Sequence, residues 1–465
     1  MITSRWNDDE ARTYCARYAA DWGEDVALRV YTSQLIGRDE DLVLHGGGNT
    51  SVKSTYRTVL GDDVPALYVK GSGWDLVSLE PPGLPAVDLE HCRRLRSLET
   101  LSDEAMVNEL RTHMFDADGP NPSVEALLHA FLAPTYVDHS HADAILALTN
   151  CADAGDFLQE CFGDDVLLVP YVMPGFGLAR VASDVYDADP GAKGMILLKH
   201  GLFTYGDTAR QSYENHIALV ARAEAFLSGK RGDRPARKRV EVAMPSGVST
   251  ADVLASIRGA VAVRDQAGAV TKRFCLVLRD DPACLSFAND SEMAAAARTG
   301  PLTPDHVIRT KALPLVLDMS AVVDGASLTT AVRVQVASYE KDYLAYVDRS
   351  KAERGVSPVP LDPKPRIVLV PGLGLIGVGE TRRAADVAAD LYEHTIRVKS
   401  LVTEISTYEA LPALDLFDVE YWSLEQAKLS GRAPEPLQGQ VALITGGCGA
   451  VGLGIGTVLR DAGPR

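Results

Sequence analysis

Three histidines are spaced so that they could hold a metal ion. Two of them, His139 and His141, stand two residues apart in the stretch VDHSHADAILAL. If this stretch begins as a β-strand, a spacing of two puts both imidazoles on one face. A third, His200, ends the strand-like run GMILLK, and Gly201 after it leaves the backbone free to turn. Imidazole nitrogens are preferred ligands of Zn²⁺, so these residues predict a zinc site.

A carboxylate for the same site is predicted at Glu125. It lies in PSVEALLHAFL, whose pattern predicts a helix over residues 123–132 with Ser123 as the N-cap. Zinc sites in enzymes commonly add a carboxylate to their histidines, so Glu125 completes the predicted set. Two alternatives stay open. In the first, His139 and His141 are ordinary polar residues at the edge of a strand and bind no metal. In the second, His129, one helical turn after Glu125, is a metal ligand.

Two glycine-rich loops offer hydrogen-bond donors to an anion. HGGGNTS, residues 45–51, follows the apolar run LVL, and its three glycines let backbone N–H groups point into one concavity. KGSGW, residues 70–74, also follows a strand-like run. Two such loops favour a phosphate, while a plain hairpin turn is the alternative for the first. The predicted anion-binding residues are Asn49, Thr50, Ser51, Ser72 and Gly73.

Two further glycine motifs lie in the second half of the chain. GLGLIG, residues 372–377, follows the strand candidate RIVLV and precedes a predicted helix, 381–395. No strand ending in an acidic residue follows about 20 positions later, which favours a close strand-to-helix turn over a dinucleotide site. The second motif, TGGCGAVG, follows the strand candidate 441–444 and is typical of the nucleotide loop of a Rossmann half. Its predicted cofactor-binding residues are Gly446, Gly449 and Gly452.

Composition excludes several classes of protein. A formal net charge of −17 argues against a basic nucleic-acid binder, and 46% hydrophobic residues argue against disorder. The first 24 residues lack the basic start and apolar core of a signal peptide, and no window of about 18 apolar residues predicts a membrane span. Seven cysteines without a CxxC pair predict reduced thiols in a cytoplasmic protein.

The order of apolar runs and helical patterns predicts an α/β protein of several domains. Short strand candidates at 42–44, 66–69, 166–169 and 194–198 alternate with helical stretches before the basic interval 228–239, which is typical of a linker. A second α/β unit follows, and prolines at 434 and 436 mark another linker. The predicted domains are 1–230, 240–430 and 437–465. Only thirteen residues follow Gly452, so the third is expected to be just the start of a Rossmann domain.

The motifs HGGGNTS, GSGWD, PSVEALLHAFL, DHSHADA and LLKHGLFTYG together resemble the class II aldolase/adducin family. With TPDHVIRTK and FDVEYWSLEQAKL, their order is similar to that of bifunctional rhamnulose-1-phosphate aldolase/short-chain dehydrogenase proteins. The resemblance implies a class II aldolase-like sheet with covering helices, a second α/β domain and the first βα element of a Rossmann domain. It further implies a homo-oligomer that acts on a small sugar phosphate. The acidic charge and the lack of a long apolar window predict that no nucleic acid or membrane is a partner.

The family also implies roles for individual residues. His139, His141 and His200 bind Zn²⁺, Glu125 is the catalytic acid/base, and the five anion-binding residues above hold the substrate phosphate. Tyr171 lies in a neighbourhood that contributes to the substrate pocket in relatives, but its flanking sequence differs. The implied reaction is retro-aldol cleavage of a ketose 1-phosphate, L-rhamnulose 1-phosphate, to dihydroxyacetone phosphate and L-lactaldehyde.

Three other functions stay open at this point. A sugar-phosphate epimerase or dehydratase could use the same zinc site, and an adducin-like interaction module could share the fold without catalysis. Binding of NAD(P) is expected only with a complete dehydrogenase domain. Because the Tyr-x-x-x-Lys pair of short-chain dehydrogenases has no room after Gly452, oxidoreductase activity is not expected of this chain.

Overall fold

The computed structural model describes residues 1–232, 240–427 and 435–463 and divides into two units. Unit 1 comprises Met1–Arg234 with Glu404–Ala410, and unit 2 comprises Pro235–Thr403 with Leu411–Arg465. Each unit combines helices with a β-sheet, which confirms the predicted α/β class. Among the described residues, every helix is too short or too polar to cross a bilayer. Of the predicted linkers, 233–239 and 428–434 lie outside the described residues.

A mixed sheet of seven strands forms the centre of unit 1, in the order β3-β2-β1-β4-β7-β6-β5. Neighbouring strands pair antiparallel except β5 and β6, which are parallel. The predicted strand at 42–44 is absent, because the amides of Leu42 and Val43 both donate to the Asp39 carbonyl and close a turn. The strands are β1 (Asn49–Arg57), β2 (Asp63–Val69), β3 (Ala86–Asp88), β4 (Tyr136–Ser140), β5 (Val166–Val169), β6 (Gly194–Leu197) and β7 (Gly201–Gly206).

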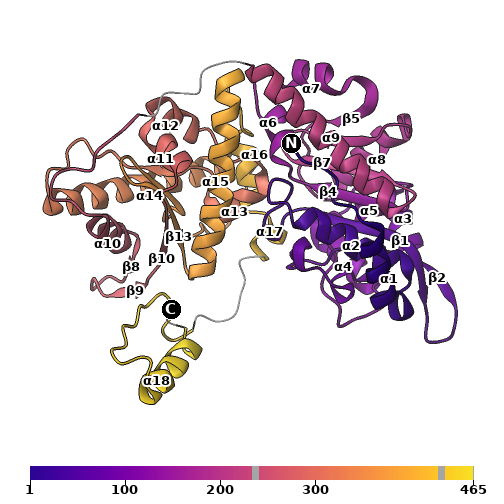
Figure 1. The fold of residues 1–465 in the computed structure, drawn as a ribbon, viewed down its shortest axis with the longest axis horizontal. Coiled ribbons are helices and arrows are strands. Elements are labelled where there is room, and N and C mark those ends of the chain that lie inside the picture. The colour runs from indigo at the N-terminus through magenta and orange to yellow at the C-terminus, as the bar shows by residue number, and fades with distance from the viewer. Residues whose placement is uncertain (233–239, 428–434, 464–465) are drawn as a thin grey trace. The chain divides into compact units, whose positions relative to one another are not determined.

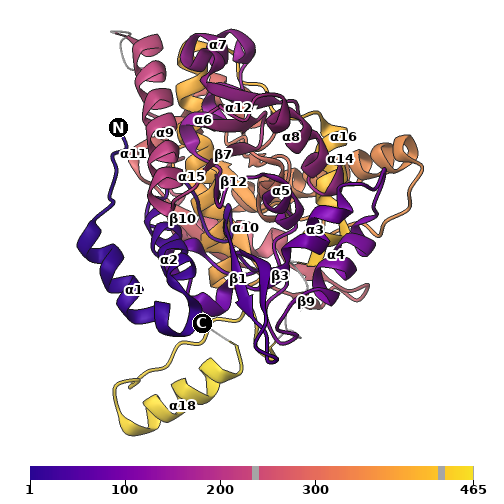
Figure 2. The same ribbon diagram turned by 90° about the vertical axis from the view of Figure 1, so that its right-hand side faces the viewer.

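Helices cover both faces of this sheet. α2 and α9 pack on the face to which Asp138 and Ser140 of β4 point, and Figures 1 and 2 show the long helix α9 beside α6 and α2. α9 starts where the Thr208 hydroxyl accepts from the amide of Gln211, an N-cap bond. The helices of unit 1 are α1 (Asp8–Trp22), α2 (Glu24–Gly37), α3 (Leu89–Leu95), α4 (Asp103–Thr112), α5 (Ala126–Phe131), α6 (Asp143–Thr149), α7 (Ala154–Phe162), α8 (Phe176–Ala188) and α9 (Ala209–Arg231).

Unit 2 is built on a four-stranded sheet in the order β10-β13-β12-β11. Apolar side chains of α10 and α14 form a core on one face, and those of α11, α12 and α15 form a core on the other. The four strands of this sheet are β10 (Cys275–Arg279), β11 (Leu315–Val316), β12 (Ile367–Val370) and β13 (Gly374–Gly379), and β8 (Val263–Arg264) pairs with β9 (Val270–Lys272) in a separate two-stranded sheet. The helices are α10 (Thr250–Val261), α11 (Pro282–Asn289), α12 (Ser291–Ala297), α13 (Val307–Thr310), α14 (Gly325–Arg354), α15 (Arg382–Ile405), α16 (Ala413–Glu420), α17 (Ser423–Ala427) and α18 (Ala450–Asp461).

The motif at 372–377 is neither a dinucleotide loop nor a strand-to-helix turn. It is a tight hairpin, because β12 pairs antiparallel with β13 and Val370 lies opposite Gly374. Its glycines allow close packing: a Cβ on Gly377 would come within 2.4 Å of the Ala385 carbonyl oxygen in α15. The predicted alternatives were both wrong, because Gly374 and Gly377 belong to strand β13, which α15 covers, and Gly372 lies in the hairpin turn before it.

The motif at 445–452 is partly as predicted. Its glycines form a turn, in which the Gly449 amide donates to the Gly446 carbonyl at 3.0 Å, and helix α18 follows. The predicted strand at 441–444 is not formed, because none of the described residues makes a ladder with it, and a strand needs a partner for its backbone groups. Cofactor binding by Gly446, Gly449 and Gly452 stays a prediction.

A buried ion pair joins the two motifs of unit 2 that the family resemblance singles out. Lys311, at the end of TPDHVIRTK, places Nζ 3.2 Å from Glu420 Oε1, and the Tyr343 hydroxyl donates to the same oxygen at 2.8 Å. The two charged side chains are 5% and 0% exposed. Burial lowers the pKa of Lys311 to about 8. Its φ of +64° is a conformation that costs a residue with a side chain about 1–3 kcal/mol.

We expect Lys311→Met to lower the free energy of unfolding by about 3–5 kcal/mol, because it leaves the Glu420 carboxylate buried without its cation. Urea denaturation followed by circular dichroism measures the change. The double variant Lys311→Met/Glu420→Leu is the control and should recover much of the loss, since an apolar pair can replace a buried ion pair. A single variant as stable as the parent protein would contradict this prediction.

Candidate metal centre

The structure brings the three predicted histidines together at one end of strands β4, β7 and β6 of unit 1. His139 lies in β4, His141 follows its end, and His200 lies in the turn between β6 and β7. The strand order β4-β7-β6 places these segments side by side, and one nitrogen from each histidine lies within 4.8 Å of the others. His139 Nε2 and His141 Nε2 are 3.1 Å apart. Two imidazole lone pairs meet at this distance only around a proton or a cation, so the arrangement fits a divalent metal ion.

The orientation of His139 is fixed by its neighbours. Its Nδ1 is hydrogen-bonded to the Leu202 carbonyl at 3.1 Å, and its ring stacks on Phe203 with centroids 4.1 Å apart. A carbonyl partner on Nδ1 directs Nε2 to the centre, the usual outer-shell arrangement of a metal-binding histidine. The turn does not depend on the backbone flexibility of Gly201 that the sequence predicts. Lys199 has the positive φ, +59°, and Gly201 instead allows close approach, because a Cβ there would lie 2.3 Å from the Ser140 carbonyl oxygen.

Glu125 lies at the same centre and is 7% exposed. Its Oε2 is 3.5 Å from His139 Nε2, and its Oε1 is 3.7 Å from His200 Nε2. The predicted helix 123–132 begins later than expected, at Ala126, so Glu125 occupies the position before it. The reason is a local turn in which the Glu125 amide donates to the Ser123 hydroxyl at 3.2 Å and the Ala126 amide donates to the Ser123 carbonyl.

The first glycine-rich loop leads directly into β1, and its polar residues point in different directions. Asn49 lies opposite His139 in the β1–β4 pairing and donates from Nδ2 to Glu125 Oε2 at 2.6 Å. The Thr50 hydroxyl is 2.8 Å from that of Ser33, and the Ser51 hydroxyl is 2.8 Å from His129 Nδ1. Thr50 and Ser51 are fully buried and engaged inside the protein, so their predicted role as phosphate donors is corrected to internal hydrogen bonding.

The second loop is open. Ser72 and Gly73 are exposed, and a Cβ on Gly73 would meet nothing within 4 Å. Lys70 begins the predicted loop KGSGW but is not among the predicted anion-binding residues; it follows β2 directly and is 4% exposed. Its Nζ donates to the Gly46 carbonyl at 3.0 Å and so joins the two glycine-rich loops. A lysine directly before GSG in an acidic chain is the signal that could have indicated it.

A buried polar network supports β4 from behind. The carboxylate of Asp138 pairs with Arg29 and accepts from the Ser212 hydroxyl at 2.5 Å. His216 is hydrogen-bonded through Nε2 to Ser140 at 2.6 Å and through Nδ1 to Thr204 at 2.9 Å. These residues fix the strand that carries His139. Their residue types alone did not predict this supporting role. Burial lowers the pKa of His216 to about 4.

Stability is expected to fall as the pH drops from about 6.5 to about 4, in part because of His216. The unfolded chain binds a proton to this histidine near its ordinary pKa of 6.5, whereas the folded protein binds it only near 4. The unfolded state therefore binds more protons in this window, and the shift is worth about 3 kcal/mol. Urea denaturation at a series of pH values measures it. His216→Gln should flatten the slope, and equal slopes would rule this contribution out.

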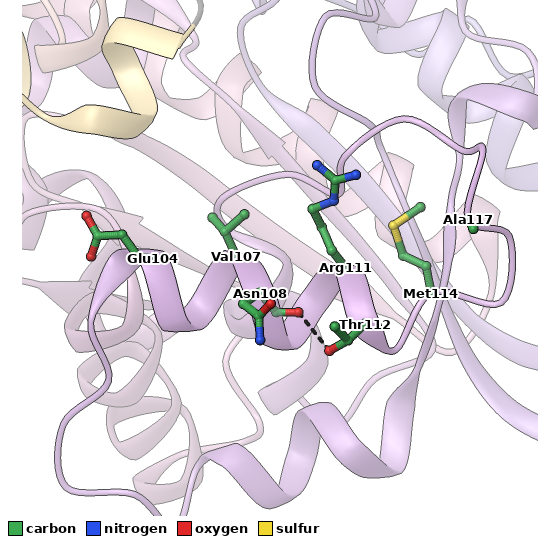
Figure 3. A pocket seen from close by; sticks show the side chains of 7 residues that line it. All are labelled: Glu104, Val107, Asn108, Arg111, Thr112, Met114 and Ala117. Carbon is green, nitrogen blue, oxygen red and sulfur yellow. Dashed lines mark hydrogen bonds between the residues drawn. The ribbon is translucent and has the colours of Figure 1, made fainter.

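Two other features of unit 1 do not combine with this centre. His91, Glu109 and His113 also lie close together, with His91 Nε2 2.8 Å from Glu109 Oε2. Their imidazole rings are stacked with centroids 3.3 Å apart and planes only 6° apart, so the in-plane lone pairs lie in two nearly parallel planes and do not converge on one point. A surface pocket of about 480 Å³ lies along α4 (Figure 3), and none of the predicted site residues lines it. Tyr171 lies in the loop between β5 and α8.

Family models match both units. Residues 28–227 match the class II aldolase and adducin N-terminal domain, and residues 248–429 match the second domain of class II aldolases. A protein of Bacillus subtilis (strain 168) named uncharacterized oxidoreductase YuxG is 33% identical over 466 residues. The match covers 97% of this chain and 64% of that protein, so the chain spans less than two thirds of this relative's length.

Solved structures are similar to a little under half of the chain. The N-terminal class II aldolase domain of a conserved Thermoplasma acidophilum protein is 39% identical, with 49% of this chain and 100% of that chain covered and a TM-score of 0.44. L-fuculose-1-phosphate aldolase from Thermus thermophilus is 18% identical, covering 44% and 96%, with a TM-score of 0.29. A sugar-phosphate aldolase from Thermotoga maritima is 15% identical, covering 45% and 97%, with a TM-score of 0.33. The chain thus carries class II aldolase domains, the aldolase/adducin N-terminal domain over residues 28–227 and the second domain over residues 248–429.

Proposed function

We propose that unit 1 is a Zn²⁺-dependent aldolase that cleaves a ketose 1-phosphate into dihydroxyacetone phosphate and a hydroxyaldehyde. The observation that carries the proposal is the buried carboxylate of Glu125 at 3.5 and 3.7 Å from the nitrogens of two converging histidines. A metal-binding group with an acid/base beside it can catalyse reversible carbon–carbon cleavage next to a carbonyl. L-Rhamnulose 1-phosphate, giving L-lactaldehyde, is the substrate that the sequence resemblance suggests.

In this mechanism His139, His141 and His200 hold the metal, which supplies Lewis-acid stabilisation of the substrate oxygens when bound. As the C3–C4 bond breaks, the C4 hydroxyl becomes the aldehyde and releases its proton to solvent, and the protonated Glu125 delivers a proton to C3. The carboxylate left behind takes up a proton again from solvent, and in the synthetic direction it removes the proton from C3. Asn49 holds Oε2 of Glu125, which directs Oε1 to the side of His200. The carboxylate is therefore positioned before substrate binds.

The substrate phosphate is proposed to bind at the open second loop. Ser72 offers a hydroxyl and Gly73 a backbone N–H, and both are exposed. The Lys70 ammonium, 3.0 Å from the Gly46 carbonyl, supplies a local positive charge in a chain whose formal net charge is −17. Asn49 can add its second amide hydrogen. Local charge and donors, more than net charge, determine whether a phosphate is held.

The proposed aldolase activity belongs to unit 1. Self-association into a homo-oligomer is a further expectation that rests on the family resemblance. The Bacillus subtilis relative is named an oxidoreductase, and the glycine turn at 446–452 is the part of this chain that an NAD(P)-dependent activity would use. Lyase activity in unit 1 does not depend on that turn.

The decisive experiment is a panel of ketose 1-phosphates incubated with the zinc-loaded protein, with coupled detection of dihydroxyacetone phosphate. Two carbon fragments from one substrate support the aldolase. A single isomeric product identifies an epimerase, and loss of water without cleavage identifies a dehydratase. Purified protein that binds no zinc and turns over no sugar phosphate would favour an adducin-like interaction module instead.

A further inference from the structure

Four buried polar side chains form a continuous hydrogen-bonded chain that ends on Glu125. Ser51 Oγ is 2.8 Å from His129 Nδ1, and His129 Nε2 is hydrogen-bonded to Asn49 Oδ1. Asn49 Nδ2 then donates to Glu125 Oε2 at 2.6 Å. Ser51 and His129 are fully buried, and Asn49 is 6% exposed. The chain therefore runs inside the protein from strand β1 to the edge of the metal centre.

Two simple spacings create this arrangement. Asn49 and Ser51 are two residues apart in β1 and so face the same side of the sheet, whereas Thr50 between them faces Ser33 of α2. Glu125 precedes α5, and the His129 amide donates to its carbonyl at 3.2 Å, which places the two residues one turn apart. The strand pair and the helical pair interlock, because each residue of one pair contacts a residue of the other.

The direction of the hydrogen bonds follows from the last link. Asn49 donates from its NH₂ group to Glu125 Oε2, so its side-chain oxygen faces His129. That oxygen only accepts, so His129 must carry its hydrogen on Nε2. Burial holds the pKa of His129 well below its ordinary value, which keeps the ring neutral. Its Nδ1 then has a lone pair and accepts from the Ser51 hydroxyl.

We propose that His129 is a positioning residue that orients the carboxylate of Glu125 through Asn49, with Ser51 fixing its tautomer. The proposal rests on the proposed function, since it gives Glu125 the acid/base role. It also replaces the alternative in which His129 is a metal ligand, because both ring nitrogens are engaged away from the three histidines. Without the relay, the carboxylate loses the donor that fixes one oxygen next to the metal centre, and its proton-transfer geometry is lost.

The test compares His129→Leu with His129→Gln in the full chain with zinc added. His129→Leu removes the donor to Asn49, and we expect kcat to fall on the order of 10–100-fold, the usual cost of losing an outer-shell partner. KM and zinc content should stay unchanged. His129→Gln, whose side-chain amide can replace the Nε2–H donor, should recover most of kcat. Ser33→Ala, which removes a buried hydroxyl on the other side of the sheet, is the control and should keep parental kcat.

Loss of zinc in His129→Leu, or equal losses of kcat in both His129 variants, would overturn the positioning role. A second readout does not need turnover. In protein labelled with ¹⁵N-histidine, the ring signals of His129, assigned by their absence in His129→Gln, should report a neutral ring with its hydrogen on Nε2. A hydrogen on Nδ1 would overturn the proposal. If the parent protein cleaves no ketose 1-phosphate, the proposed function fails, while this spectrum still decides the relay.

Discussion

Glu125→Gln is expected to lower turnover by about 10²–10⁴-fold while zinc stays bound, the range that a positioned general acid–base group contributes. Glutamine has nearly the same size and still offers an oxygen to the Asn49 amide that now donates to Oε2 at 2.6 Å. It cannot exchange a proton with carbon. The three histidines are untouched, so binding of metal and substrate should change little. Steady-state rates of dihydroxyacetone phosphate release measure the loss of turnover, and zinc content per chain measures whether the metal stays bound.

A matched control for this substitution is Glu104→Gln. Glu104 is an exposed carboxylate on α4 and lines the surface pocket of Figure 3, away from the predicted site residues. It undergoes the same change of charge and should keep parental turnover. Retained cleavage in Glu125→Gln would remove this residue from the mechanism. Lost zinc would instead show that the carboxylate serves mainly as a metal ligand.

The parts of the site that the sequence predicts well are those set by local periodicity. A spacing of two places His139 and His141 on one side of β4 and just beyond it, as the structure shows. Their approach to His200 is a different matter, because it depends on the order β4-β7-β6, in which β7 follows β6 in sequence but lies between β6 and β4. That order comes from long-range pairing, and no local pattern contains it.

The errors in the phosphate loop have the same origin. The letters NTS supply three polar side chains, but period-two alternation in β1 sends Thr50 to one face and Asn49 and Ser51 to the other. Which face carries the chemistry is decided by what packs there: α2 with Ser33 on one side, and the segment of Glu125 and His129 on the other. Those partners lie far away in sequence, so the three residues could not be distinguished beforehand.

The glycine motif of unit 2 shows how a tertiary contact overrides a local signal. GLGLIG suggests a loop, because glycine weakens a strand and has no side chain to pack. In the structure Gly377 lies in β13 because the Ala385 carbonyl and the Ala389 side chain of α15 fill the space that a side chain would need. The preceding strand, β12, is a plain apolar run, and its prediction is confirmed. The hairpin could therefore not be recognised without knowing that α15 packs on β13.

His141→Ala is expected to abolish stable zinc binding and with it the cleavage of ketose 1-phosphates. The three imidazole nitrogens lie within 4.8 Å of one another, and removing one leaves two, fewer than the three protein ligands of catalytic zinc sites. The loss of affinity should exceed the ~10–100-fold that removal of an outer-shell partner costs. Zinc content after dialysis, measured by atomic absorption, and release of dihydroxyacetone phosphate report the outcome.

The control for this variant is His91→Ala. His91 also stands in a group of two histidines and a glutamate, but its ring is stacked on that of His113 at 3.3 Å and the lone pairs do not converge. If convergence of lone pairs decides which group holds zinc, His91→Ala keeps both metal and activity while His141→Ala loses both. Full zinc content with unchanged cleavage in His141→Ala would refute the ligand assignment. Loss of zinc in His91→Ala alone would move the metal site to α3 and α4.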